Sequence, residues 1–493
     1  MEISPLKRYT PRPFAILYPG HRTLGVLSED AETVYKGRRQ IERALTELSN
    51  HLLFVHSSLE SLKHTTGALS WQMNTWRGRQ TGMVHLPSGA KVTSLRQTLV
   101  TSPDPYADVE TVLQWLSNYG VSPGSISGMA WNLFRASLSR TVVISADAEL
   151  GRNSFYGGRQ QCSTPKIYKG MQAVDITAAY PHAMSTRDYA LSLREVSPFT
   201  TIDPEEPGIA VAKVYVPSSM PYGPIPIRVD SVSYGDRVQA IQFPYGVLNG
   251  TWTWCELDAA AQLGCKIEVV KAYAPRRRAD LFGPWWKMAQ TGRSLPGEAP
   301  NLAKAVMNST WGQFAMTGEE RAQVNWTTEA GDTAYEVQLD DRKMPHRYAC
   351  HIASETTSRV RRRLLLEGLY GPTKPPVHAD TDGIVVSATS EMPKDSGTGF
   401  GQWRKKETMM QLDLRAPQLY RYLCGPQCGT THPQWHYVAS GMAQPAAERY
   451  FATHNHLRTT VAFFGGPDQV LPIGFANDPA ELLQLQKEAR YIA

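Results

Sequence analysis

Residues 379–386 read Ala-Asp-Thr-Asp-Gly-Ile-Val-Val, so two aspartates flank a threonine directly before an apolar run. On a strand or in a tight hairpin, Asp380 and Asp382 fall on the same side of the backbone. Aspartate is also common in ordinary turns. The stretch alone therefore predicts either a simple hairpin turn or two carboxylates aimed at one point.

A third aspartate ends another apolar stretch much earlier in the chain. Asp175 lies near the end of a strand that we expect at residues 172–176, and Tyr180-Pro181 follow after a turn. Taken alone, Asp175 could equally cap a helix. Carboxylates that converge repel one another, and a bound Mg²⁺ or Mn²⁺, which prefers oxygen ligands, relieves that repulsion. Together the three aspartates indicate a divalent-metal site.

A helix that we expect at residues 300–316 lies between these two elements. Lys304, Asn308 and Trp311 are spaced i, i+4 and i+7, so they share one helical face. Such a face could bind a nucleotide through its phosphates, sugar and base. The alternative is an ordinary amphipathic helix with Trp311 in the core. Gly312 would let another backbone or a base pair approach closely.

Taken in chain order, the elements at Asp175–Pro181, Lys304–Gly312 and Asp380–Asp382 resemble motifs A, B and C of the family B DNA polymerases. The likeness is greatest to the small phage enzymes that include the protein-primed ones. Phe155-Tyr156-Gly157-Gly158-Arg159 is similar to the Y-x-G-G-R loop between exonuclease and polymerase domains, with Phe155 where Tyr is usual. Gln418-Leu419-Tyr420 resembles the K-x-Y motif, with Gln replacing Lys. The resemblance covers residues 150–445.

The resemblance implies an α+β multidomain fold: a right-hand polymerase with palm, fingers and thumb and an N-terminal ribonuclease-H-like domain. The expected parts are the exonuclease-like domain 1–150, the linker 151–170 with its Y-x-G-G-like loop, palm 171–275, fingers 276–316, palm 317–395, and thumb and C-terminal region 396–493. By position alone, residues 443–493 supply the thumb.

The implied activity is DNA-templated addition of dNTPs to a primer 3′-hydroxyl by two-metal phosphoryl transfer. Two Mg²⁺ ions, which Mn²⁺ can replace, would be held by Asp175, Asp382 and the backbone carbonyl of Ile176, with support from Asp380. Lys304 would contact the triphosphate and supply a proton to the leaving pyrophosphate.

Further roles follow from the same resemblance. Tyr180 would pack beneath the sugar as a steric gate against ribonucleotides. The other implied nucleotide-binding residues are Asn308, Trp311, Arg293 and Lys287, and the implied DNA-binding residues are Phe155, Gly157, Gly158, Arg159, Gly312, Gln418 and Tyr420. The partners are primer-template DNA, dNTPs, and a priming protein or another replication factor, with no membrane.

The sequence departs from the family pattern at several positions. Ala178-Ala179 stand where Ser-Leu is usual, and Gly383 where Ser is common, but neither change removes a metal ligand. Gln418 removes a positive charge that the family places near the primer strand. We therefore predict that Gln418→Lys tightens primer-template binding.

The N-terminal region lacks the family's exonuclease ligands. The first exonuclease strand carries a D-x-E, whereas residues 14–18, Phe-Ala-Ile-Leu-Tyr, contain no carboxylate. Residues 56–60 resemble the second exonuclease motif, with Glu60 replacing Asp. Because one carboxylate cannot hold two metals, we predict a degenerate, structural exonuclease-like domain. An active exonuclease hidden by divergence and an unrelated fold are the alternatives.

Basic and metal-ligating residues also cluster outside the motifs. Arginines crowd residues 359–363 and 276–278, and Arg404, Lys405 and Lys406 form a third basic cluster; each cluster is either a solvated basic face or a set of phosphate contacts. Cys424, Cys428, His432 and His436 suit tetrahedral Zn²⁺ in type, although the intervening Gly and Pro residues preclude a regular helix. Zinc is thus a hypothesis, and a hairpin containing Cys and His is the alternative.

Length and composition limit the classes of protein to which this chain can belong. The 493 residues, 42% of them hydrophobic, suffice for about three packed domains. A net charge of +6 permits a polyanionic partner without establishing one. Six cysteines and the lack of a leader in residues 1–16 favour a cytoplasmic protein, in the host cytoplasm if it is phage-encoded. No apolar window reaches the length of about 18 residues that a membrane span needs.

Two other functions remain open at this point. One is a polymerase-shaped scaffold that binds nucleic acid and has lost efficient synthesis. The other is a polymerase with RNA-primed, primer-independent or protein-primed initiation. An insertion that grips a priming protein would lie at residues 324–344.

Overall fold

The computed structural model describes residues 2–6, 14–20, 23–28, 32–36, 38–48, 52–55, 71–76, 79–85, 91–94, 103–122, 126–145, 147–233, 236–315, 321–329, 332–339, 349–425, 433–439, 448, 451–452, 458–463 and 470–475. The chain divides into two compact units. Residues 1–145 and 280–350 form the first unit, and residues 146–279 and 351–493 form the second. No described helix has the length and apolar character needed to span a membrane.

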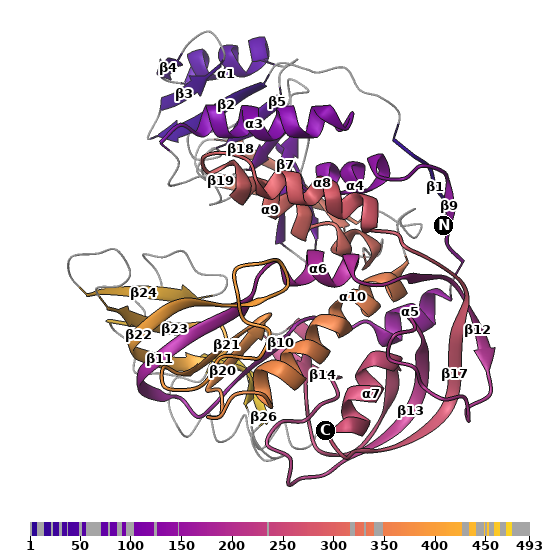
Figure 1. Ribbon diagram of the computed structural model, residues 1–493. Helices are drawn as coiled ribbons and strands as arrows, with labels where there is room; N and C mark the ends of the chain where they lie inside the picture. Colours follow the sequence, from indigo (N-terminus) through magenta and orange to yellow (C-terminus); the bar gives the residue numbers. More distant parts are fainter. Residues whose placement is uncertain are drawn as a thin grey trace. The chain divides into compact units, whose positions relative to one another are not determined.

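The first unit contains a nine-stranded mixed sheet (Figure 1). Its order is β19 (Asp332–Leu339), β18 (Arg321–Glu329), β6 (Trp71–Trp76), β7 (Arg79–His85), β8 (Lys91–Ser94), β5 (Leu52–Val55), β2 (Phe14–Gly20), β3 (Thr23–Leu27) and β4 (Glu32–Lys36). Strand β5 runs parallel to β2 and β8, whereas the other pairs are antiparallel. Helix α1 (Arg38–Glu47) connects β4 to β5. Consecutive buried residues at Ala15, Ile16 and Leu17 fit a strand covered on both faces.

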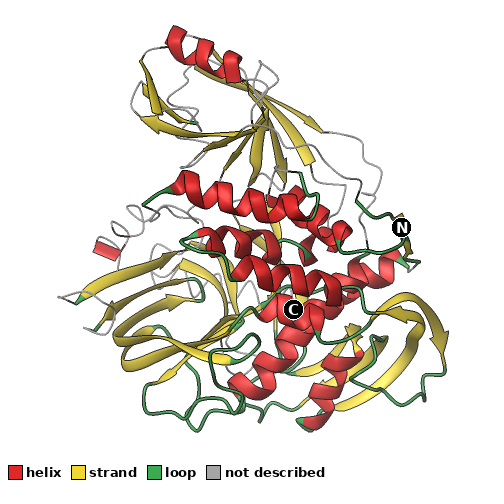
Figure 2. Ribbon diagram, turned by 45° about the horizontal axis from the view of Figure 1, so that its top comes forward, coloured by secondary structure: helices red, strands yellow, loops and turns green. Residues whose placement is uncertain are grey.

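A helical layer in the same unit joins its two chain segments. It consists of α3 (Pro105–Asn118), α4 (Ile126–Ala136), α8 (Gly283–Arg293), α9 (Ala299–Asn308) and the 3₁₀ helix η3 (Trp311–Ala315). Helices α3, α4 and α8 all contact α9 (Figure 2). Phe134 packs with Phe282 and Phe314 at ring-centroid distances of 5.2 Å in each case. A short pair of β1 (Glu2–Ile3) and β9 (Val142–Val143) completes the unit.

Two polar anchors fix α8 and α9 to α3. Asp108 Oδ1 accepts hydrogen bonds from the backbone N–H groups of Glu298 (3.0 Å) and Ala299 (3.2 Å), and so caps the start of α9. Trp115 Nε1 donates to the Met288 carbonyl at 3.2 Å. The helix pair that carries the predicted nucleotide-binding residues is therefore held by the N-terminal segment.

The second unit is built on another nine-stranded sheet. Its order is β24 (Gln434–Ala439), β23 (Leu419–Cys424), β22 (Trp403–Ala416), β11 (Lys166–Ile176), β21 (Gly383–Ser387), β20 (His378–Thr381), β10 (Arg159–Cys162), β25 (Arg458–Phe463) and β26 (Val470–Phe475). Only β10 and β25 pair in parallel among these described strands. Strand β10 and the start of β11 occupy the stretch expected as a linker.

Helices and a smaller sheet complete the second unit. The helices are α5 (Ala148–Ser154), α6 (Ala179–Ser185), α7 (Trp254–Gln262) and α10 (Cys350–Arg363), and α10 continues as a π-helical segment, Leu364–Leu369. The smaller sheet has the order β12 (Tyr189–Val196), β17 (Lys266–Ala279), β13 (Ile209–Val216) and β16 (Gly246–Thr253), and β14 (Ile227–Ser233) pairs with β15 (Asp236–Gln242).

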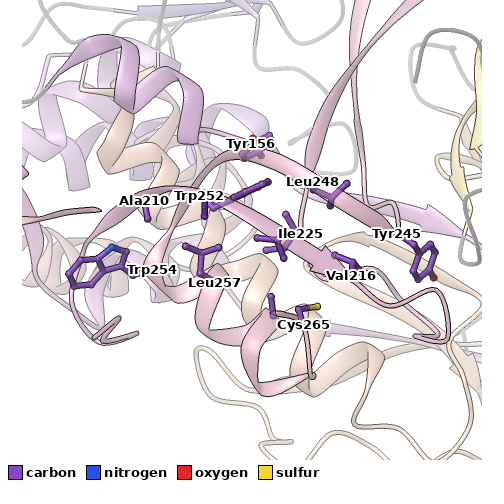
Figure 3. Close-up of a cluster of buried hydrophobic side chains, with 13 residues drawn as sticks. Tyr156, Ala210, Val216, Ile225, Tyr245, Leu248, Trp252, Trp254, Leu257 and Cys265 are labelled. Atoms are coloured by element: carbon purple, nitrogen blue, oxygen red, sulfur yellow. The ribbon is translucent and has the colours of Figure 1, made fainter. Parts of the chain in front are cut away.

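The core between α7 and the smaller sheet centres on Trp252, which is fully buried and donates from Nε1 to the Pro226 carbonyl at 2.7 Å (Figure 3). Tyr156, from the loop before β10, belongs to the same cluster. The core thus holds one of the predicted motif residues in place.

Candidate active site

The Asp380-Thr381-Asp382 stretch forms the turn of a tight hairpin between β20 and β21. Asp380 lies opposite Gly383, and the backbone N–H of Asp382 donates to the Asp380 carbonyl at 2.7 Å. Thr381 takes a φ of 64°, in the left-handed region, which closes the turn within two residues. The sequence allowed either a continuous strand or a tight hairpin at residues 380–382, and the structure has the hairpin.

Strand β11 places Asp175 beside this turn. Asp175 lies opposite Gly383 in the antiparallel pair, and the N–H of Ile176 donates to the Asp382 carbonyl at 3.0 Å. A Cβ at Gly383 would lie 3.2 Å from the Val174 carbonyl oxygen, so a larger residue there would have to push β11 away. The backbone of the second unit thus brings the Asp175 and Asp382 positions next to each other.

The Asp175 carboxylate is 21% exposed and lies between two cations of β22. Arg404 Nη2 is 3.7 Å from Oδ1, and Lys406 Nζ is 3.8 Å from Oδ2. Oδ1 is buried and has no hydrogen-bond partner among the described residues. A buried carboxylate oxygen without a hydrogen bond is costly unless a cation compensates it.

The chemistry of this donor set fits a hard divalent cation. Two aspartates on adjacent backbone positions provide oxygen ligands, and Asp175 offers an oxygen without a hydrogen bond. Across the described part of the chain, no three His, Cys, Asp or Glu side chains lie close enough together to hold a metal by themselves. Backbone carbonyls, substrate oxygens and water would therefore complete the coordination, as is usual for Mg²⁺.

Asp380 faces hydrogen-bond donors instead. Its Oδ1 accepts from Gln160 Nε2 (3.3 Å), Gln418 Nε2 (3.4 Å) and Thr381 Oγ1 (3.0 Å). Gln418 reaches it from the turn between β22 and β23, with a left-handed φ of 63°. These contacts fit the supporting role expected for Asp380 rather than that of a principal ligand.

Tyr180 lies in the first turn of α6 and is almost fully buried. Burial raises the pKa of its phenol, and the nearby Asp382 carboxylate raises it further, so the hydroxyl keeps its proton at neutral pH. A Cβ at Gly158 would lie 3.1 Å from Tyr180 Oη and 2.9 Å from Thr381 Cγ2. Only glycine lets the loop before β10 approach both motifs so closely.

Arg159 is buried inside the second unit. It is 1% exposed, donates from Nε to Gln161 (2.6 Å) and from Nη2 to the Gly223 carbonyl (2.9 Å), and stacks over Phe243. Desolvation lowers the pKa of its guanidinium to about 9. This burial does not support the predicted contact of Arg159 with DNA, whereas Phe155, Gly157 and Gly158 are partly exposed.

The arginines of α10 correct a second prediction. All four are engaged within the second unit, so they form neither a solvated basic face nor a row of phosphate contacts. The ion pairs are Arg359 with Glu355 (3.0 Å), Arg361 with Glu256 (2.8 Å), Arg362 with Asp258 (2.9 Å), and Arg363 with Glu367 (2.8 Å) and Asp395 (2.6 Å). The sequence missed this because each acidic partner except Glu355 and Glu367 comes from a distant segment.

The predicted nucleotide-binding residues lie in the first unit. Lys304 and Asn308 are exposed on one side of α9, whereas Ala303 and Met307 are buried on the other. Helix α9 ends at Asn308, and Trp311 begins the following 3₁₀ helix. The expected i, i+4, i+7 face therefore holds for Lys304 and Asn308 but not for Trp311, because the helix stops before reaching it.

The neighbouring candidates of this unit differ in environment. Lys287 is exposed on α8, while Arg293 Nη1 donates to the Pro300 carbonyl at 2.9 Å and so ties α8 to α9. A Cβ at Gly312 would meet no atom within 4 Å, so nothing in the described chain explains this glycine.

The zinc hypothesis receives no support from the described residues. Cys424 is disulfide-bonded, and a disulfide sulfur is not the thiolate that binds zinc. The His436 ring stacks on Tyr422 at 4.9 Å between centroids. Cys428 and His432 lie outside the described residues, as do residues 56–60 with Glu60.

Sequence reasoning missed several residues of this site. Gln160 directly follows the Y-x-G-G-R-like loop and donates a hydrogen bond to Asp380. Its role depends on its place in β10 opposite Asp380, which the pairing of β10 with β20 determines. Arg404 and Lys406 were noted as part of a basic run, but their proximity to Asp175 depends on the pairing of β11 with β22.

Comparisons with known proteins find one family model and several solved structures that this chain resembles. Residues 123–350 match the family model of DNA polymerase type B, organellar and viral. A search of curated protein sequences finds no significant match. Solved structures of phi29 DNA polymerase resemble the fold: the orthorhombic crystal form is 13% identical, with a TM-score of 0.63 over 89% of this chain and 94% of that one.

Its ternary complex with primer-template DNA and incoming nucleotide is 12% identical, with a TM-score of 0.62 over 90% of this chain and 94% of that one. The α+β multidomain architecture is thus shared with a small phage polymerase, and the resemblance seen in the motifs is confirmed. Residues 123–350, slightly less than half of the chain, are thus similar to the type B DNA polymerases, and together with the shared fold this match supports a DNA-directed DNA polymerase.

Proposed function

We propose that this polymerase adds dNTPs to a primer 3′-hydroxyl at the β20–β21 turn, with Asp175 and Asp382 as the principal metal-binding carboxylates and without proofreading. The observation that carries the proposal is the adjacency of these two positions, together with a buried Asp175 oxygen that has no hydrogen-bond partner among the described residues. In this assignment the second unit supplies the palm, α8 and α9 belong to the fingers, and the C-terminal strands lead into the thumb.

Divalent ions held by Asp175, Asp382 and the Ile176 carbonyl would activate the primer hydroxyl and neutralise charge on the triphosphate. The chain's own residues position the reactants. Asp380, held by Gln160 and Gln418, orients the turn, and the protonated Tyr180 packs against the sugar. By its motif, Lys304 contacts the triphosphate and gives a proton to pyrophosphate, beside Asn308, Trp311, Lys287 and Arg293 as further nucleotide contacts.

The N-terminal part of the first unit is proposed to be a ribonuclease-H-like domain without nuclease activity. The antiparallel strands β4, β3 and β2 are continued by the parallel strands β5 and β8. Strand β2 reads Phe-Ala-Ile-Leu-Tyr-Pro-Gly and supplies no carboxylate, so it cannot contribute the D-x-E of an exonuclease. The hairpin of β18 and β19 extends this sheet through β6, and it occupies the stretch where a grip on a priming protein is expected.

Primer extension with purified protein tests the proposed site. Wild type should extend a labelled primer on a DNA template with Mg²⁺ or Mn²⁺, and Asp175→Asn and Asp382→Asn should each reduce kcat by about a hundred- to a thousandfold. Glu268→Gln removes an exposed carboxylate of β17 in the same unit and should extend like wild type. Extension that survives in both aspartate variants would refute the assignment. Failure of wild type despite salt-sensitive DNA binding would favour a scaffold or an enzyme that needs a special primer.

A further inference from the structure

The loop before β10 is held from α10 by one buried arginine. Arg361 Nη1 donates to the carbonyls of Tyr156 and Gly157, the latter at 2.7 Å. The Arg361 side chain is 3% exposed, and its Nη2 lies 2.8 Å from Oε1 of the equally buried Glu256. One guanidinium thus fixes two consecutive carbonyls of the loop while its own orientation is fixed by a carboxylate.

The Glu256 carboxylate is itself held in place. Its Oε2 accepts from Thr253 Oγ1 at 3.2 Å, at the start of α7. A planar guanidinium in such a fork resists rotation, which a lysine ammonium does not. The loop is therefore tied to α7 and α10 through a single rigid group.

The other end of the loop touches the proposed site. Gly158 follows Gly157 directly, and a Cβ on it would lie 3.1 Å from Tyr180 Oη and 3.2 Å from Thr381 Cα. The hydroxyl end of Tyr180 therefore abuts the backbone that Arg361 holds one residue away. Any shift of this backbone removes or tightens the contact with the ring.

We propose that Arg361 is a positioning residue for sugar selection: by holding the Tyr156 and Gly157 carbonyls, it fixes Gly158 against the Tyr180 hydroxyl and so sets the height of the ring beneath the nucleotide sugar. The proposal rests on the role of Tyr180 given under the proposed function. Arg361 touches no reacting atom, and its effect reaches the nucleotide only through the loop and Tyr180.

The chain offers a matched control on the same helix. Arg362 is the next residue, and it pairs with Asp258 at 2.9 Å instead of binding the loop. Arg361→Lys and Arg362→Lys make the same chemical change one position apart. Arg361→Lys removes the contact with the loop, whereas Arg362→Lys leaves that contact in place.

The test compares kcat/KM for a dNTP with that for the matching rNTP in primer extension. We expect Arg361→Lys to lower this ratio by about tenfold or more, because small displacements of positioning groups have effects of this order, while Arg362→Lys stays within about twofold of wild type. In parallel, fluorotyrosine placed at position 180 should show a shifted ¹⁹F resonance in Arg361→Lys only. If Arg361→Lys loses its cooperative unfolding transition, Glu256→Gln replaces it in the test. This variant keeps the Arg361 guanidinium but removes the carboxylate that orients it toward the loop.

Tyr180→Val distinguishes the proposed role of Tyr180 in sugar selection from the positioning role of Arg361. If it lowers the dNTP/rNTP ratio while Arg361→Lys leaves both the ratio and the ¹⁹F resonance unchanged, the positioning proposal is wrong and the role of Tyr180 stands. If Tyr180→Val leaves the ratio unchanged in an active enzyme, the role of Tyr180 fails and the proposal fails with it.

Discussion

Asp175 shows how the environment of a single residue determines its chemistry. Its carboxylate combines a buried oxygen without a described hydrogen bond and two flanking cations, Arg404 and Lys406. Both cations are about half exposed, so solvent screens their interaction with the carboxylate. They compensate its charge but also repel a divalent ion that approaches it.

Removal of these cations should therefore favour metal binding. In Arg404→Gln/Lys406→Gln we expect half-maximal extension at a Mg²⁺ concentration about two- to fivefold lower than in wild type, at constant ionic strength. Lys405→Gln is the matched control, because Lys405 lies between them on β22 but is opposite Val174 instead of Asp175. A higher magnesium requirement in the double variant would show that the cations assist binding instead.

Gln418 carries a second prediction at this scale. Its amide donates to Asp380, and replacement by lysine would place a cation there. We expect Gln418→Lys to bind primer-template DNA more tightly and to steepen the dependence of log K on log salt by up to about 0.9. Gln418→Met, which has no charge, should show no such increase in slope. An unchanged slope in the lysine variant would mean that this position does not face a phosphate.

At the scale of elements, α9 depends on a cap from another helix. Asp108, in α3, satisfies the N–H groups of Glu298 and Ala299 at the start of α9, and Gly297 beside it takes a left-handed φ of 61°. A Cβ at Gly297 would lie 2.5 Å from Asp108 Oδ1, so glycine is required at this junction.

Asp108→Ala should loosen α9 selectively. We expect a loss of about 1–2 kcal/mol in the stability of the first unit and faster amide hydrogen exchange in the first turn of α9. Asp104→Ala removes the cap of α3, where Asp104 accepts from the Ala107 N–H, and should accelerate exchange in α3 instead. If amide hydrogens in α9 exchanged equally fast in Asp108→Ala and Asp104→Ala, Asp108 would not be the cap of α9.

The junction of α10 with β12 predicts a pH dependence. Burial lowers the pKa of His351 to about 4, and its Nε2 donates to the Ala190 carbonyl at 2.9 Å. Because the unfolded chain protonates near 6.5, it binds more protons than the folded one between these values, so stability falls as pH falls from about 6.5 to 4. The loss can reach roughly 3 kcal/mol.

Urea unfolding at pH 7.5 and pH 5 measures this effect. His351→Gln keeps a donor in place and should lose less stability than wild type over that interval. An equal loss in both proteins would assign the acid sensitivity to other groups.

Local pattern predicted the elements that carry the motifs. The strand expected at residues 172–176 lies within β11, and the helix expected at residues 300–316 is observed as α9, although it ends at Asn308. The adjacency of Asp175 with Asp382 agrees with what the motifs imply. Three features could not be predicted, because each depends on which distant segments meet. They are the ion pairs of the α10 arginines, the burial of Arg159 and the cations beside Asp175.

At the scale of the whole molecule, the absence of a carboxylate on β2 predicts a polymerase that leaves errors in place. A terminally mismatched primer incubated with Mg²⁺ and without dNTPs should keep its full length over a period in which a matched primer with dNTPs is fully extended. Glu60→Ala should leave this result unchanged. Trimming by wild type that disappears in Glu60→Ala would show that an active exonuclease persists.

The order in which strands join the nine-stranded sheet of the second unit also affects how the chain is made. Strand β11 lies between β21 and β22, and its partners are synthesised more than two hundred residues after it. At about 5–20 residues per second, a ribosome needs roughly ten to fifty seconds to deliver them. During this interval β11 has neither of its neighbours, and such long-range pairing also folds slowly. Overproduction should therefore give more soluble enzyme at low temperature or with added chaperones.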